Sequence, residues 1–168
     1  MGFVRLAATA AILIAVTLWL QCGGMAVLIQ MARVSLAKEI HRLNPFRSGL
    51  LVIRFTALTI ALHMLQILLW ASFYRWKCIS SWESAFYFSA GSYSTVGYTD
   101  VLLPQVWRVL GPIESVIGVV MCGMSVSVLF AIAARLVETE EKTAGGEGTQ
   151  LQRQAVAAAG DLEAVPNR

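Results

Sequence analysis

Residues 84–99 read SAFYFSAGSYSTVGYT and contain no charged side chain. An uncharged segment of this length suggests an element that enters a membrane, because an ordinary surface loop would be polar. The segment is too short to span a bilayer as a helix, and its second half is rich in Gly, Ser and Thr. Irregular backbone is tolerated at membrane depth only where protein buries it or water lines it. The segment is therefore predicted to be re-entrant, as in the wall of a pore.

Three longer stretches flank this segment and are almost uncharged. They cover residues 6–32, 55–74 and 109–134, and among them only Glu114 carries a charge. About 20 apolar residues span a hydrocarbon core of about 30 Å. The first stretch exceeds the ~7–15 apolar residues of a secretory signal, so we expect it to be retained. The predicted fold class is an all-α membrane protein with three transmembrane helices, a re-entrant pore helix and a filter loop.

The composition favours a membrane protein over a soluble domain. Of the 168 residues, 57% are hydrophobic and 14% are charged, and the mean hydropathy is +0.67. Soluble domains carry about 25% charged residues. Residues 138–168 have a net charge of −3 and the remainder has +6, so the positive charge belongs to the membrane part and its flanks. This distribution argues against a nucleic-acid partner.

The sequence divides into four regions. Residues 1–32 are predicted to form an extra N-terminal transmembrane helix, and residues 137–168 a disordered cytoplasmic tail. Residues 33–49 form a connection that either contains a short interfacial helix or extends the first span inward. The pore domain covers residues 50–136. Its expected parts are an outer helix at 50–74, a pore helix at 81–91, a filter at 94–100 and an inner helix at 107–136.

The connection between the first two spans predicts the orientation in the membrane. Glu39 is its only acid, and it stands among five bases: Arg33, Lys38, Arg42, Arg47 and Arg54. By the positive-inside rule this connection is cytoplasmic. The N-terminus and the segment 84–99 are then expected outside and the C-terminus in the cytoplasm, in a multi-pass protein of the cell (inner) membrane.

Signals for a short helix precede the irregular half of the re-entrant segment. Ser80 and Glu83 have the S-x-x-E spacing of a capping box, and the Glu83 carboxylate complements the positive start of a helix. The helix can continue to Gly91. Its carboxyl end would then point its negative dipole into the membrane, towards a cation.

Thr95-Val96-Gly97-Tyr98, which follows this helix, resembles the signature filter of potassium channels. The resemblance covers residues 49–136 and is to the bacterial family with two transmembrane helices per subunit, whose pore module is shared with two-pore-domain channels. Other features that resemble the family are the aromatic pore helix, Asp100 after the filter, Trp107-Arg108 at the start of the inner helix, and Gly118.

The resemblance implies that backbone carbonyls of Thr95, Val96, Gly97 and Tyr98 bind K⁺ in place of its water shell. Gly supplies backbone conformations with positive φ without a Cβ penalty. One chain offers one such strand, so a ring of carbonyls requires a homotetramer. The implied partners are K⁺, the lipid bilayer and three further copies of the chain. K⁺ is the permeant ion, and no cofactor is expected.

Thr99 stands where the family has a second filter glycine. A β-branched residue at positive φ is an outlier, and holding it there costs about 1–3 kcal/mol. We therefore expect Thr99 to weaken selectivity or open probability. Asp100 next to it either concentrates cations at the outer mouth or has a structural role. The partner Glu that some relatives place in the pore helix is replaced here by Gly91.

Three residues of the spans have two interpretations each. Glu114 is either an interfacial charge at a helix start or a buried acid that buttresses the pore loop. Gly118 is either the gating hinge that the resemblance implies or a site of close helix packing. His63 has either a structural role or a role in proton transfer or pH sensing.

The leading function predicted is a potassium-selective channel. The alternatives are a weakly selective or normally silent cation channel, because of Thr99, and a non-conducting modulatory subunit. An enzyme is not expected, because the two histidines, His41 and His63, lie in different segments and no nucleophile–base pair is evident. The three cysteines have no metal-site spacing and are interpreted as packing residues.

Overall fold

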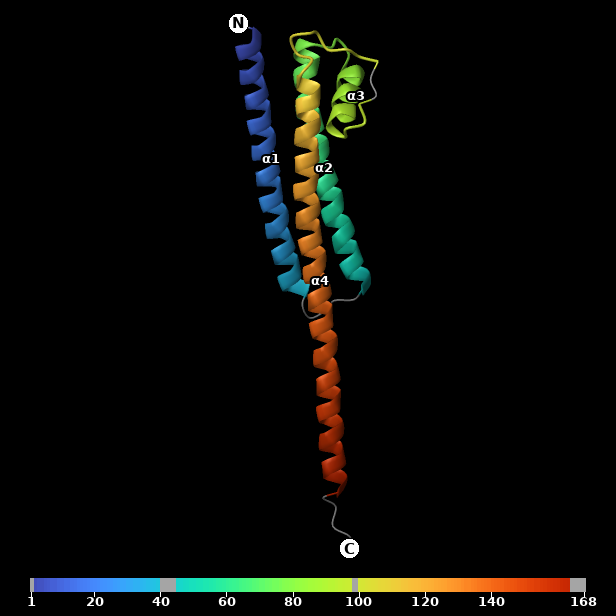
Figure 1. The fold of residues 1–168 in the computed structure, drawn as a ribbon. Coiled ribbons are helices and arrows are strands. Elements are labelled where there is room, and N and C mark those ends of the chain that lie inside the picture. Colours follow the sequence, from blue (N-terminus) through green and yellow to red (C-terminus); the bar gives the residue numbers. More distant parts are fainter. Residues whose placement is uncertain (1, 40–44, 98–99, 164–168) are drawn as a thin grey trace.

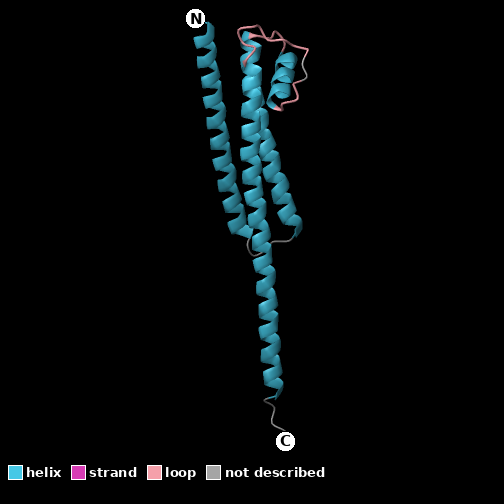
Figure 2. Ribbon diagram, in the orientation of Figure 1, coloured by secondary structure: helices cyan, strands magenta, loops and turns pink. Residues whose placement is uncertain are grey.

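The computed structural model describes residues 2–39, 45–97 and 100–163, with side chains described over 4–35, 48–97 and 100–138. These residues form four helices: α1 (Gly2–Glu39), α2 (Pro45–Lys77), α3 (Trp82–Tyr93) and α4 (Leu110–Glu163). Figures 1 and 2 show α1, α2 and α4 side by side as a bundle, with the short α3 packed against one end of it. The described residues contain no strand.

Three of the helices are long and apolar enough to cross a membrane. The spans are Val4–Ser35, Ser48–Lys77 and Leu110–Glu138. All three carry large hydrophobic side chains that the chain leaves exposed, among them Trp19, Ile53 and Val126. Exposed apolar surface of this kind is what helices in contact with lipid present. The predicted all-α membrane fold with three spans and a short fourth helix is confirmed.

The short α3 lies at the end of the bundle where the chain begins (Figure 1). It packs against α2 and α4. The backbone N–H groups of Cys78 and Ile79 both donate to the Tyr74 carbonyl at 2.8 Å, which ends α2 and turns the chain towards α3. We call this end of the bundle, which carries α3 and the N-terminus, the α3 end.

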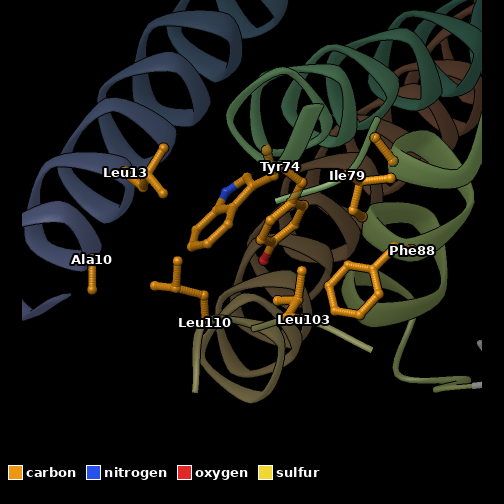
Figure 3. Close-up of a cluster of buried hydrophobic side chains, with 9 residues drawn as sticks. Ala10, Leu13, Tyr74, Ile79, Phe88, Leu103 and Leu110 are labelled. Atoms are coloured by element: carbon orange, nitrogen blue, oxygen red, sulfur yellow. The ribbon is translucent and has the colours of Figure 1, made fainter. Parts of the chain in front are cut away.

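A buried apolar cluster fixes α3 to the bundle (Figure 3). Trp70 and Tyr74 of α2 lie at its centre with no exposed surface, and the rings of Tyr74 and Phe88 meet edge to face at 5.0 Å between centroids. The other members are Ala10, Leu13, Ile79, Ala85, Leu103 and Leu110. Edge-to-face aromatic pairs contribute about 0.5–1.5 kcal/mol beyond the area that they bury. The cluster therefore defines where α3 sits.

A second apolar cluster closes the opposite end of the bundle. Met25 and Leu28 of α1 pack there with Phe55 of α2 and Leu136 of α4. Gly24 lies next to this cluster, and a Cβ added to it would meet the Leu62 side chain at 2.6 Å. Gly23 has open space around it. Close helix packing therefore explains Gly24 and not Gly23.

The structure bears on two expectations about the flanks of the bundle. Residues 33–39 continue α1 without a break, which agrees with the alternative that the first span extends inward. Residues 40–44 lie outside the described residues. The prediction of a disordered tail from residue 137 is wrong, because α4 runs on as one helix to Glu163. Its added turns extend an existing helix, which avoids the cost of nucleation.

The predicted capping box at Ser80 and Glu83 is also wrong. Helix α3 begins at Trp82, so its N-cap is Ser81, whose side chain makes no capping hydrogen bond. Glu83 falls at the second helical position, whereas a capping box needs an acid at the third. Glu83 is still in the first turn, where its charge complements the helix dipole.

Candidate functional site

The segment after α3 doubles back along the end of that helix. The N–H of Ser94 donates to the Ala90 carbonyl, that of Thr95 to Ser92, and that of Gly97 to Gly91, each at 3.0 Å. Among the described residues, no backbone N–H donates to the carbonyls of Thr95, Val96 or Gly97. The side chains of this segment are exposed in the single chain. The amides of Ser94, Thr95 and Gly97 are thus satisfied by α3, whereas the carbonyls of Thr95, Val96 and Gly97 are available to a ligand.

Two residues of this segment have left-handed backbone. Gly97 has φ 70°, as expected for the filter glycine, and Thr95 has φ 64°. Thr95 is the one positive-φ residue other than glycine in the described part of the chain. A β-branched side chain at such a φ is an outlier that costs about 1–3 kcal/mol and is concentrated at functional sites. Sequence reasoning gave this conformation to glycine and missed Thr95.

Two residues that carry the filter prediction, Tyr98 and Thr99, lie outside the described residues. The roles expected for them therefore stay predictions. The next residue, Asp100, is exposed and lines a hollow of about 240 Å³ together with Glu83 and Tyr87. The structure thus brings Asp100, which was expected near the outer mouth, together with Glu83 at the N-terminal end of α3.

Glu114 lies buried behind α3, with no exposed surface. Its carboxylate accepts a hydrogen bond from the Tyr74 hydroxyl at 2.8 Å and one from the Ser89 hydroxyl at 2.5 Å. Ser89 also approaches the Ile67 carbonyl at 2.9 Å. Glu114 of α4 therefore links α2 to α3. This geometry favours the interpretation as a buried buttress over that as an interfacial charge.

Gly118 of α4 lies against Tyr93, the last residue of α3. A Cβ added there would overlap the Tyr93 backbone carbonyl oxygen, which belongs to α3 and cannot swing away. Gly111, two turns earlier on α4, similarly faces the Phe88 ring, which a Cβ would meet at 3.2 Å. The approach of the two backbones therefore explains Gly118 as a packing residue, and its role as a gating hinge stays a prediction.

A buried polar cluster joins all four helices in the middle of the bundle. Its members are Gln21 of α1, His63 and Gln66 of α2, Tyr93 of α3 and Ser125 of α4, and we call it the polar ring. Both ring nitrogens of His63 are engaged, Nδ1 with Tyr93 at 2.8 Å and Nε2 with Ser125 at 2.9 Å. The structure thus supports a structural role for His63.

Sequence reasoning missed the polar ring, although one signal was present. Gln21 and Gln66 are amides inside membrane spans, where unpaired polar groups are costly and a partner is expected. Their pairing could not be known from the sequence, because they are 45 residues apart and on different helices.

Comparison with known proteins adds one match. A family model described as an ion channel matches residues 52–135, which is half of the chain. The match includes α3, the segment that follows it, most of α2 and the spanning part of α4, and it leaves out α1. Neither a curated protein nor a solved structure matches the chain.

Proposed function

The chain belongs to the ion channel family, and from this premise we propose that it is a potassium-selective channel assembled from four copies. The observation that carries the proposal is the left-handed backbone at Thr95 and Gly97, two residues apart in an exposed segment. A backbone that alternates between left- and right-handed residues points successive carbonyls to one side. Such a row of carbonyls is the element with which a channel replaces the hydration shell of K⁺.

The hydrogen bonding of the segment supports the same proposal. Because the amides of Thr95 and Gly97 donate to α3, the segment is held at its amide side and offers its carbonyls on the other. A K⁺ ion needs carbonyls around its whole circumference. A single chain contributes one row, so four chains around one axis are required. In that arrangement the exposed side chains of this segment meet the neighbouring copies or the pore.

Thr99 favours a second candidate, a weakly selective or normally silent cation channel. It occupies the place of the second filter glycine in the sequence that the chain resembles. Continuing the alternation from Thr95 and Gly97 by two residues leads to this position. A second β-branched residue at positive φ would add to the cost at Thr95. A non-conducting subunit that assembles with a relative is the third candidate.

Purified chain reconstituted in liposomes distinguishes the three candidates. We expect K⁺ flux that greatly exceeds Na⁺ flux under equal gradients. Equal fluxes of both ions, made selective by Thr99→Gly, would establish the second candidate. A tetramer that carries neither ion would contradict the proposal and favour the third.

A pair of glycine substitutions controls this experiment. Gly97→Ala places a Cβ on a residue with φ 70° and should abolish K⁺ flux, because alanine resists that conformation. Gly23→Ala, in α1, meets no atom within 4 Å and should leave the flux unchanged. Equal flux from both variants would show that Gly97 is not part of the conducting path.

A further inference from the structure

Helix α1 lies outside the residues that match the family, yet it reaches the pore domain through two buried polar side chains. Thr17 and Gln21, one turn apart, have no exposed surface. Thr17 accepts a hydrogen bond from the Trp70 indole N–H at 3.0 Å, and this contact involves α2 alone. Gln21 belongs to the polar ring. The two residues therefore offer a matched pair, of which only Gln21 is joined to α3 by a chain of hydrogen bonds, whereas Thr17 reaches α3 only through the packing of Trp70.

The hydrogen bonds of the polar ring form a closed circuit. The Gln21 amide nitrogen donates to the Ser125 hydroxyl at 2.9 Å, and the Gln66 amide nitrogen donates to the Gln21 carbonyl oxygen at 2.6 Å. The Tyr93 hydroxyl donates to the Gln66 carbonyl oxygen at 2.5 Å. His63 closes the circuit between Tyr93 and Ser125.

Counting hydrogens gives the circuit one direction. Tyr93 has a single hydroxyl hydrogen and uses it on Gln66, so the His63 Nδ1–H must donate to the Tyr93 oxygen. Nε2 of a neutral imidazole then accepts from Ser125, whose oxygen in turn accepts from Gln21. Each of the five members donates once and accepts once around the circuit. Without Gln21 the circuit opens, and the buried amide of Gln66 loses its acceptor.

Tyr93 is the member of the circuit that meets the filter. It is the last residue of α3 and precedes the strained Thr95 by two positions. Its hydroxyl is fixed by the polar ring, and its carbonyl oxygen lies against Gly118 of α4. A strained backbone persists only where its surroundings over-determine it. The hydroxyl of Tyr93 is one such constraint, and its orientation depends on Gln66 and, through Gln66, on Gln21.

The geometry points to α1 as a working part of the filter, in which Gln21 is a positioning residue that acts through Gln66 and Tyr93. This inference rests on the proposed function for its meaning, because it assigns a support to the ion-selective segment. A pore needs only two spanning helices and a pore helix, so α1 has no evident role in it. The inference gives α1 such a role. Helix α1 here holds the filter from behind without touching it.

The test compares Gln21→Leu with Thr17→Val in the full-length protein. The first readout is hydrogen exchange of the peptide that contains residues 94–97, in reconstituted protein. We expect Gln21→Leu to accelerate this exchange about three- to tenfold, the range that hydrogen bonds in membrane proteins produce. Thr17→Val removes a buried hydrogen bond outside the polar ring but keeps the shape of the side chain against Trp70, so the cluster around α3 stays packed and the exchange should remain at the wild-type rate. Equal rates in the two variants would overturn the inference.

The second readout is the ratio of K⁺ to Na⁺ flux. Gln21→Leu should lower it and Thr17→Val should not. A double variant, Gln21→Leu with Tyr93→Phe, should be no worse than Tyr93→Phe alone, because both substitutions act on one circuit. Additive effects would show that Gln21 does not act through Tyr93. If Gln21→Leu fails to assemble, Gln21→Asn replaces it, because asparagine keeps the amide but is one methylene too short to reach both partners. The same two measurements then test the inference.

The two readouts separate the inference from the proposed function. Hydrogen exchange does not require conduction, so faster exchange in Gln21→Leu supports the circuit even if the wild-type protein carries no K⁺. If the wild-type channel is selective but Gln21→Leu changes neither the exchange of residues 94–97 nor the selectivity, the inference is overturned and the proposed function stands. A silent wild-type protein would overturn the proposed function alone.

Discussion

At the scale of single residues, the hydrogen bonds of Glu114 predict how substitutions at this position change the thermal stability. Ser89 has one hydroxyl hydrogen for two acceptors, Glu114 and the Ile67 carbonyl, while Tyr74 donates to the other carboxylate oxygen. A glutamine at position 114 would accept from Tyr74 and donate to Ser89, which could then donate to Ile67. We therefore expect Glu114→Gln to unfold close to the wild-type temperature in thermal melts of the detergent-solubilised protein.

Glu114→Leu is expected to be destabilised in the same melts. Leucine fills the space but leaves the buried Tyr74 hydroxyl without an acceptor, at a cost of about 1–3 kcal/mol. Glu83→Gln serves as the control, because Glu83 is an exposed acid of α3 and should have little effect. If Gln and Leu at position 114 were equally destabilising, the charge of Glu114 and not its hydrogen bonding would be what matters.

Glu114 also shows what could be predicted at this scale. Its place in the first outer turn of a span is readable from the sequence, and so were its two possible roles. Its partners were not readable, since Tyr74 and Ser89 precede it by 40 and 25 residues and lie on two other helices. The filter could be proposed from the sequence because four consecutive residues carry the pattern. The positive φ of Thr95 was not predicted, because the turn of the chain back along α3 imposes it. The conformational preference of threonine by itself gives no sign of this turn.

At the scale of helices, the contact between α3 and α4 gives a test of the two interpretations of Gly118. A Cβ at this position overlaps the Tyr93 carbonyl oxygen, so Gly118→Ala must push the two helices apart. Overpacking of this kind costs typically about 1–3 kcal/mol. We expect Gly118→Ala to melt at a lower temperature and to have faster hydrogen exchange in α3.

Gly123→Ala is the matched control on the same helix. A Cβ at Gly123 meets no atom within 4 Å, and alanine favours a helix over glycine by up to about 1 kcal/mol. Its melting temperature should be unchanged or slightly higher. A Gly118→Ala protein with wild-type stability but altered opening would contradict the packing role and support the hinge.

The helices themselves were largely predictable, for a physical reason. A stretch of 20 or more uncharged residues has few alternatives to a spanning helix, because hydrocarbon leaves no other way to satisfy the backbone. The tail was mispredicted because Gly145, Gly146 and Gly148 each disfavour a helix by about 1 kcal/mol. Those residues follow a span that is already helical, and each adds to it without a new nucleus. The helix propensity of the separate residues was therefore a poor guide to the structure of this tail.

At the scale of the whole molecule, the positions of the termini give a test of orientation. The N-terminus and α3 lie at one end of the bundle and the C-terminus at the other (Figure 1). The basic residues of the connection between the first two spans are expected in the cytoplasm, so we expect the α3 end outside. Cys78, in the turn between α2 and α3, lies at the α3 end and marks it chemically. The thiol is half-buried, and burial raises its pKa.

We expect a membrane-impermeant maleimide to label Cys78 from the outside of sealed right-side-out vesicles. The variant should carry Cys22→Ala and Cys122→Ala, so that no other thiol reacts. Only the thiolate reacts, and a raised pKa means a smaller thiolate fraction at pH 8 than for an ordinary cysteine. Labelling should therefore begin slowly and accelerate about tenfold per pH unit until the pH reaches the pKa. A variant that also carries Cys78→Ser should remain unlabelled. Labelling from inside-out vesicles alone would reverse the orientation. A rate that rises only about threefold between pH 8 and pH 9, as for a thiol with the ordinary pKa of about 8.5, would show that Cys78 is not held in the half-buried turn.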